Sequence, residues 1–312
     1  MKVLVAGATG GLGRSLVPKL IAAGHEVTGM IRSESGAAGV RAHGADVVLA
    51  DGLDAAAVMA AVQTARPEVV VHQMTALKGG IDFKKFDQSF AVTNRLRTEG
   101  TDHLLAASQA AGVRRFVVQS YAGWNMLQEG SATKTEADPL DPDPVPAQRQ
   151  TMAGIKHLES AVTGAEGIEG VALRYAAFYG PTGTIGKGGE LVELIRQRKL
   201  PLVGNGAGVW SFIHYDDAAD ATVKAIESDA TGIYQIADDD PAAAAVWLPE
   251  LARILGAKPP RRIPAWLARP MIGDTGVAAF TTIRGVDNTL AKKTFDWKPG
   301  YTSWREGFRK GL

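Results

Sequence analysis

The stretch that decides the fold is Met1-Lys2-Val3-Leu4-Val5-Ala6-Gly7-Ala8-Thr9-Gly10-Gly11-Leu12-Gly13-Arg14. An apolar run breaks into glycines and then restarts with helical spacing, which predicts a strand, a tight turn and a helix. Glycines in the spacing G-x-x-G-x-x-G permit the turn, the close approach of a pyrophosphate and tight packing of helix on strand. The N–H groups at the helix start then face the phosphates.

The residues that follow supply the context that this motif needs. The helix carries Leu12, Leu16, Leu20 and Ile21 on one face, and a second strand runs from Glu26 to Ile31. A βαβ unit of roughly 30 residues is what a dinucleotide fingerprint requires. The alternative is a glycine-rich loop in an unrelated α/β protein. We therefore predict a dinucleotide site whose first residues are Gly7, Thr9, Gly10, Gly11, Leu12 and Gly13.

Composition excludes several other classes of function. The 312 residues have a formal net charge of +1 and contain no basic run, which argues against nucleic acid or a membrane surface as the main partner. Without cysteine, a thiolate nucleophile, a disulfide framework and a cysteine metal site are impossible. The histidines are scattered, so we expect no metal site. No apolar window of about 18 residues and no leader pattern is present, so the expected location is the cytoplasm.

One arginine bears on which dinucleotide binds. Arg32 follows the second strand, where an acidic residue would accept hydrogen bonds from the ribose hydroxyls of NAD. An arginine fork suits a 2′-phosphate instead, and such a charge-assisted bond contributes roughly 1.5–3 kcal/mol. We predict NADP as the cofactor, with NAD as the alternative. Arg32 as an ordinary surface arginine is the competing interpretation.

Further strands predict an α/β fold of the Rossmann type, a doubly wound parallel sheet with a smaller, mainly C-terminal substrate lobe. Strands are expected at 46–50, 68–74, 115–119 and 233–237, and helices at 55–65, 89–111, 151–162 and 190–198. The predicted core spans 1–175 with 210–238 returning to it, and the lobe spans 176–209 and 239–312. The strand ends place further cofactor residues at Asp51, Gly52 and Leu53 beside the adenine and at Met74, Thr75 and Ala76 beside the pyrophosphate.

Several later motifs resemble those of one enzyme family. They include Val70-Val71-His72, Glu99-Gly100-Thr101, Leu173-Arg174 with Tyr179-Gly180-Pro181, and Phe212-Ile213-His214. In this order they are similar to an extended short-chain dehydrogenase/reductase of the NAD-dependent epimerase/dehydratase superfamily. The resemblance implies hydride transfer with a nicotinamide cofactor. It also implies a homodimer, through the helices near 93–111 and 151–162.

The chain departs from that family at the catalytic pair. The family places a tyrosine and a lysine four residues apart on the helix that begins here near Thr151. One register puts Met152 and Lys156 there, and the register that Glu159 prefers puts Thr151 and Ile155. Neither supplies a tyrosine, and loss of a positioned general acid costs about 100-fold to 10,000-fold in rate. We therefore predict an atypical member that lacks the family's catalytic tyrosine.

The nearest replacement is Tyr121, with Ser120 before it at the end of the fifth strand, where the family has its catalytic serine or threonine. We name Tyr121 and Ser120 as catalytic candidates, and the alternative is that Tyr121 only roofs the site. Nucleotide-sugar members of the family hold a diphosphate with residues that are here Ala177 and Trp210, which cannot pair with phosphate. The predicted substrate pocket is instead apolar and aromatic, lined by Trp124, Met126, Met152, Phe178 and Trp210.

These observations predict an enzyme, an NADP(H)-dependent oxidoreductase that reduces an apolar or aromatic small-molecule carbonyl, quinone or enone. The alternatives are a nucleotide-sugar epimerase/dehydratase and a non-catalytic NADP-binding sensor or regulator. The Asp- and Pro-rich segment 128–150 is expected to be either a lid over the site or a rigid connector.

Overall fold

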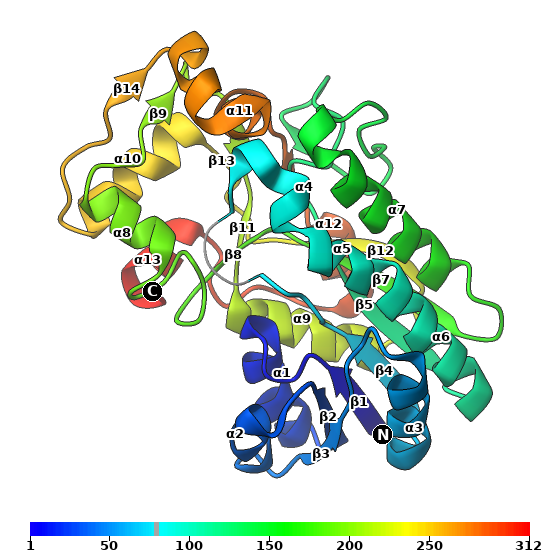
Figure 1. Cartoon of the computed structure of the whole chain (residues 1–312). Helices are drawn as coiled ribbons and strands as arrows, with labels where there is room; N and C mark the ends of the chain where they lie inside the picture. Colours follow the sequence, from blue (N-terminus) through cyan, green and yellow to red (C-terminus); the bar gives the residue numbers. More distant parts are fainter. Residues whose placement is uncertain (78–80) are drawn as a thin grey trace.

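The computed structural model describes residues 1–77 and 81–312. Residues 78–80, the start of the polar, glycine-containing stretch 78–87, therefore lie outside the described residues. The core is a seven-stranded sheet in the order β12-β7-β5-β4-β1-β2-β3, and every neighbouring pair is parallel (Figure 1). Its strands are β1 (Lys2–Ala6), β2 (Glu26–Ile31), β3 (Asp46–Leu49), β4 (Val69–His72), β5 (Arg115–Tyr121), β7 (Glu169–Tyr175) and β12 (Gly232–Ile236). The predicted doubly wound sheet is confirmed.

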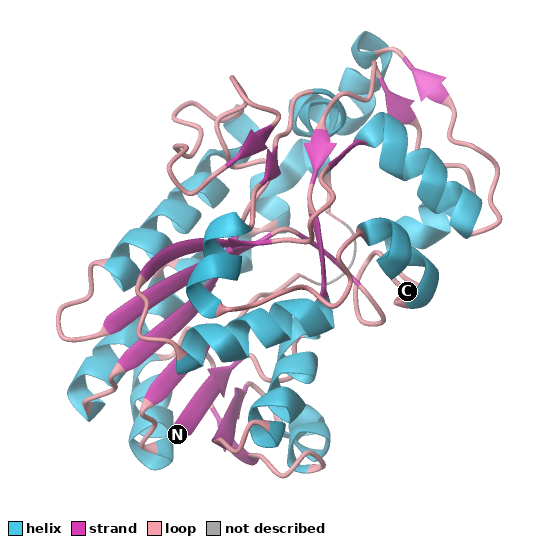
Figure 2. Cartoon of the chain, turned by 180° about the vertical axis from the view of Figure 1, so that it is seen from behind, coloured by secondary structure: helices cyan, strands magenta, loops and turns pink. Residues whose placement is uncertain are grey.

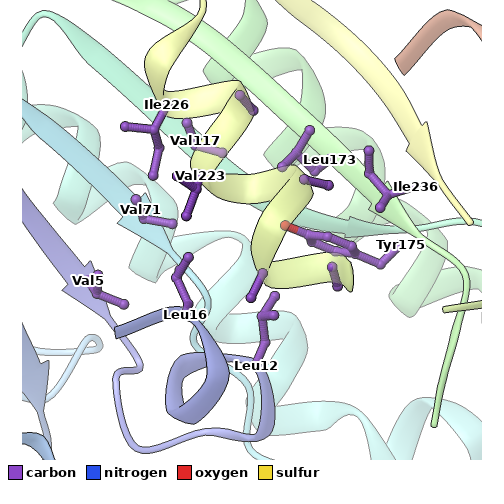
Figure 3. Packing of buried hydrophobic residues seen from close by; sticks show 14 of the residues in the cluster. Val5, Leu12, Leu16, Val71, Val117, Leu173, Tyr175, Val223, Ile226 and Ile236 are labelled. Carbon is purple, nitrogen blue, oxygen red and sulfur yellow. The ribbon is translucent and has the colours of Figure 1, made fainter. Parts of the chain in front are cut away.

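Helices cover both faces of the sheet because alternate strand residues are apolar on each side. Val5, Val71 and Val117 pack against α1 (Gly11–Ala22) and α9 (Tyr215–Glu227), as Figure 3 shows. Leu4 and Val70 belong to the core on the opposite face. There the sheet is covered by α3 (Ala55–Ala65), α6 (Glu99–Ala111) and α7 (Arg149–Thr163).

A smaller lobe occupies the upper part of Figures 1 and 2. It has its own apolar core, in which Trp247 and Phe212 pack at a ring-centroid distance of 5.5 Å. Its helices are α8 (Glu190–Arg196), α10 (Ala244–Ile254), α11 (Ala265–Thr281) and α13 (Trp304–Lys310), whereas α12 (Thr289–Phe295) packs on β12 and α9 of the core. Its strands pair two by two: β8 (Ala177–Tyr179) with β11 (Phe212–His214), β9 (Leu202–Val203) with β14 (Arg262–Ile263), and β10 (Val209–Trp210) with β13 (Ala242–Ala243).

The prediction of one continuous helix over 89–111 is wrong, because the helix breaks at Thr98. Backbone angles of φ −96° and ψ −85° there separate α5 (Ala91–Arg97) from α6. The short helices η2 (Phe83–Lys85) and α4 (Phe86–Ser89) precede α5. The break reorients α5, and the end of α5 thereby contributes Arg97 to the site described below.

Side chains cap the helices α3 and α9, and one part of the segment expected to return to the core pairs outside the main sheet. The side chain that caps α3 is Asp54, whereas Asp51 accepts a hydrogen bond from Leu53 N. His214 Nδ1 caps α9 by accepting from Asp216 N, and Asp217 instead accepts from the backbone of the 300–301 turn. In the segment 210–225, α9 packs on the main sheet, but β11 pairs with β8 and not with that sheet.

In the described ranges 1–77 and 81–312, no helix combines the length and apolar character that crossing a membrane requires. The same residues contain no group of three or more His, Asp or Glu side chains arranged to hold a metal ion.

Candidate cofactor and substrate site

The glycine turn between β1 and α1 forms a cradle that only glycine can build. Gly7 has φ +93°, and a Cβ there would lie 2.9 Å from the Gln73 backbone carbonyl. A Cβ on Gly13 would lie 2.4 Å from Gly7 O, so helix and strand touch directly. The N-cap, Gly10, provides no side-chain cap for the N–H groups of the first turn. These donors and this shape fit a dinucleotide pyrophosphate.

A cavity of about 380 Å³ opens beside this turn. It is lined by Thr9 and Arg14 from the glycine turn and α1, and by Ser35 and His43 from the segment after β2. Arg32 follows β2 directly and is exposed. The cavity therefore lies where the sequence places the adenosine end of the cofactor. Sequence reasoning missed Ser35 and His43, whose segment carries no motif.

The other predicted cofactor residues lie at the carboxyl ends of β3 and β4. A Cβ on Gly52 would lie 2.5 Å from Met74 Sδ, so these two segments meet. Met74 N donates to His72 Nδ1, and Ala76 N donates to Thr93 Oγ1. Thr75 stands between Met74 and Ala76 in the chain, and Leu53 follows Gly52. Their contacts with a cofactor remain predictions.

Ser120 takes part in a buried network rather than facing open space. Its Oγ donates to Glu159 Oε1 at 2.6 Å, and Glu159 accepts two bonds of 2.7 Å from Arg174. Ser120, Glu159 and Arg174 are 2%, 4% and 4% exposed. This network ties α7 to β5 and β7. A catalytic Ser120 therefore stays a prediction that this contact does not favour.

Tyr121 lies one residue further along, where β5 ends. Its ring stacks near Trp124, with centroids 6.2 Å apart, and Trp124 meets Phe86 edge-on at 5.0 Å. Burial raises the pKa of the Tyr121 phenol to about 12, although the charge of Arg97 opposes that shift. The phenol is thus neutral at physiological pH and can donate a hydrogen bond or a proton.

Arg97 is a residue of this site that sequence reasoning missed. Its guanidinium carbon lies 5.5 Å from the centre of the Phe90 ring, and its Nη1 donates to Asn94 Oδ1 at 3.3 Å. Burial lowers its pKa to about 10, so the side chain remains charged at neutral pH. An arginine in a helix normally faces solvent. The feature that turns Arg97 inward is the break at Thr98, which the sequence does not mark.

The positions discussed as the catalytic pair lie on α7, whose sequence contains no tyrosine. Thr151 and Ile155 are fully buried, whereas Lys156 faces solvent. Thr151 Oγ1 donates to Asp87 Oδ1 at 2.6 Å and accepts from Asn94 Nδ2. Thr151 and Ile155 therefore both lie on the inward face of α7. They are the two residues that stand in place of the tyrosine and lysine in the alignment that Glu159 favours.

The predicted pocket residues do not form one group. Trp124 lies beside Tyr121, and Phe178 stacks on Tyr215 at 4.7 Å. Met126 and Met152 are 0% and 2% exposed, within the protein core. Trp210 donates its indole N–H to Ala279 O and packs in the lobe. Their contact with a substrate remains a prediction.

Segment 128–150 is anchored to the rest of the chain. Within it, β6 (Thr133–Lys134) pairs with β15 (Gly285–Val286), and Lys134 Nζ bonds Glu129 O and Asp138. Met126 forms a bridge with Leu140. These contacts favour the rigid connector over the lid.

Comparison with known proteins agrees with this geometry. The family model for the NAD dependent epimerase/dehydratase family matches residues 3–237. A Streptomyces protein named 3-diazoavenalumate denitrifying reductase is 47% identical over 310 residues, which cover 98% of this chain and 99% of that protein. A Stigmatella aurantiaca protein named 4-hydroxy-2-methyl-3-oxo-4-farnesyl-3,4-dihydroquinoline-1-oxide ketoreductase is 26% identical, over 83% of this chain and 74% of its own length.

The fold is also shared with solved structures. The UDP-glucose 4-epimerase of Thermus thermophilus, crystallised with NAD, superposes with a TM-score of 0.73 at 24% identity. The match covers 99% of this chain and 97% of that one. Likeness at this level of identity establishes the fold.

Proposed function

Because the chain belongs to the NAD-dependent epimerase/dehydratase family and is an NAD(P)-dependent oxidoreductase, we propose that it is an NADPH-dependent reductase that replaces a diazo group on an aromatic small molecule with hydrogen. The observation that carries this proposal is the 47% identity with a denitrifying reductase along nearly the full length of both chains.

The proposed reaction balances without a proton donor. The nicotinamide dinucleotide supplies a hydride when bound. On an aryl diazonium ion, a C–H bond forms at the ring carbon while the C–N bond breaks, and the electron pair of that bond leaves with dinitrogen. The products are the arene, dinitrogen and the oxidised cofactor, so neither atoms nor charge require a general acid.

The residues of α7 support this reaction. Reduction of a carbonyl needs a proton for the developing alkoxide, which the family obtains from a tyrosine. Here the inward positions carry Thr151 and Ile155, and Lys156 faces solvent. Because replacement of dinitrogen by hydride consumes no proton, it does not require the proton donor that α7 lacks.

Reduction of an apolar carbonyl, quinone or enone is the second candidate, and Tyr121 favours it. Its neutral phenol lies at the carboxyl edge of β5, where α/β sheets place reactive groups. The identity with a ketoreductase adds support. A nucleotide-sugar epimerase or dehydratase gains no support from Ala177 and Trp210, which offer phosphates no charged partner.

One experiment separates the two candidates. The purified protein is mixed with NADPH and either a diazonium salt of an aromatic acid or an aromatic ketone, and cofactor absorbance and products are followed. We expect dinitrogen release and, with deuterium at C4 of the cofactor, label on the former C–N carbon. Tyr121→Phe is expected to change that rate less than about threefold, because no proton is transferred. A loss of about 100-fold or more, with ketone as the better substrate, would establish the second candidate.

The preference for NADP has its own test. Arg32 is exposed at the end of β2, three residues before Ser35, which lines the cavity together with Thr9 and Arg14. We expect Arg32→Ala to weaken NADP binding about tenfold or more and to leave NAD binding unchanged, as measured by calorimetry. Arg196→Ala, in the exposed Arg196–Glu193 pair of α8, is the control. Equal weakening of both cofactors would contradict the assignment.

A further inference from the structure

The cation of Arg97 is unusual because it is half-buried and has no ionic partner. Its polar contact is the neutral amide oxygen of Asn94, at 3.3 Å. Within 1–77 and 81–312, no carboxylate forms an ion pair with it, and the remaining residues, Lys-Gly-Gly, contain none. A charge withdrawn from water is costly unless an anion compensates it.

Nearby carboxylates are already engaged. Glu159, whose charge acts on Arg97, accepts two hydrogen bonds from the buried Arg174 and a third from Ser120. On the same helix as Arg97, Arg95 is exposed and pairs with Glu99 at 2.7 Å. Among the described residues, the cations of Arg95 and Arg174 are therefore each paired with a carboxylate, whereas Arg97 has no ionic partner.

The surroundings of Arg97 are aromatic. Its guanidinium lies by the Phe90 ring, which stacks on Phe86 at 4.5 Å, and Phe86 in turn meets Trp124. Tyr121 and Trp124 are partly exposed, so a ligand can reach this cluster. Flat apolar faces beside a planar fork of N–H donors match a ring that carries a carboxylate.

We propose that Arg97 binds the carboxylate of the substrate and that the substrates of this enzyme are aromatic carboxylic acids. This inference rests on the proposed function, because it assumes that the substrate binds at the carboxyl end of β5. It is independent of which group on the ring is reduced.

The cofactor phosphates are a poorer match for Arg97. They belong at the glycine turn after β1, and β4 separates β1 from β5 in the sheet. Neighbouring strands lie about 5 Å apart, so the two strand ends are separated by roughly 10 Å. Arg97 ends α5, and its charge acts on Tyr121 at the end of β5, which places it on the substrate side of this edge.

Binding of an unreactive probe tests this inference without turnover. The full-length protein is saturated with NADP and titrated calorimetrically with 4-hydroxycinnamate or with its amide. We expect the acid to bind about 10- to 150-fold more tightly than the amide. Arg97→Met should remove that difference by weakening the acid alone, Arg97→Lys should retain part of it, and the matched control Arg95→Met should retain all of it.

Two results would overturn the inference. One is equal affinity of the wild-type protein for acid and amide, a comparison that needs no variant to fold. The other is a loss of NADP affinity in Arg97→Met or Arg97→Lys with the preference for the acid intact, which would assign Arg97 to the cofactor. Binding of the acid through Arg97 without reduction of any diazo or carbonyl compound would instead refute the proposed function and leave this inference standing.

Discussion

Single side chains in this protein show how burial changes proton affinity. Asp238 follows β12 and is 1% exposed. Its Oδ1 accepts from Asp240 N, whereas Oδ2 has no partner within the described part of the chain. Burial, together with the negative charges of Asp239 and Asp240, raises the pKa of this carboxyl to about 8. Asp238 is therefore protonated in the folded protein at neutral pH.

This shift predicts a pH dependence of stability. The folded pKa lies above the unfolded value of about 4, so the contribution of Asp238 is complete below pH 4 and is lost as pH rises to about 8. We expect the free energy of unfolding of the wild type to fall more between pH 5 and pH 8 than that of Asp238→Asn. Urea unfolding at both pH values measures the difference. Parallel pH dependences in the two proteins would show that Asp238 does not titrate in this range.

Arginine side chains show why the site was only partly predictable. Arg32 is a candidate from the sequence alone, because its place after a strand has a meaning in dinucleotide-binding folds, and its contact with the cofactor stays a prediction. Arg97 was not a candidate, because a charged residue in a helix normally faces water, and its burial depends on how α5 packs against α7. The same holds for Glu159 and Arg174, whose pairing joins residues 15 positions apart on a helix and a strand.

At the scale of the element, the buried ion pair of Glu159 and Arg174 fixes α7 against β5 and β7. Removing one member leaves the other charge without a partner in the interior, which typically costs about 3–5 kcal/mol, whereas replacing both by apolar residues costs far less. We expect Glu159→Gln to destabilise the protein by about 3–5 kcal/mol in urea unfolding, and Glu159→Met with Arg174→Met to destabilise it less. Equal unfolding curves for Glu159→Gln and the wild type would mean that the pair is dispensable.

Elements with a strong periodic pattern were predicted well. The strand Glu26–Ile31 and the helix Ala55–Ala65 have the predicted bounds, because an apolar run and an Asp–Ala boundary mark them. The break at Thr98 was missed because no proline marks it, and Gly100, two residues later, lies inside α6. The side chains that cap these helices are Asp54 for α3 and His214 for α9, and Asp216 and Asp217 lie within the first turn of α9.

At the scale of the whole molecule, the core and the lobe are joined by short strands rather than by the main sheet. β7 leads through Ala176 into β8, which pairs with β11, and β11 leads directly into α9 of the core. The glycine turn belongs to the core, and Tyr215 at the start of α9 lies against it, since a Cβ on Gly11 would be 2.9 Å from the Tyr215 ring. The glycine turn therefore contacts the point where the chain returns from the lobe.

This connection predicts that cofactor binding stabilises the entire chain and not the core alone. A ligand present at about 100 times its dissociation constant adds about 2.7 kcal/mol to the free energy of unfolding. At roughly 2–4 °C per kcal/mol for a chain of this class, Tm should rise by about 5–10 °C with NADP. In a variant with Trp124→Phe and Trp297→Phe, which removes the tryptophans of the core, tryptophan fluorescence follows the lobe, where Trp247 and Trp304 are buried, and far-ultraviolet circular dichroism follows the whole fold. We expect one transition that shifts equally in both signals. A shift of the dichroism alone would show that the lobe unfolds independently, and no shift with either NADP or NAD would remove the cofactor site on which the proposed chemistry depends.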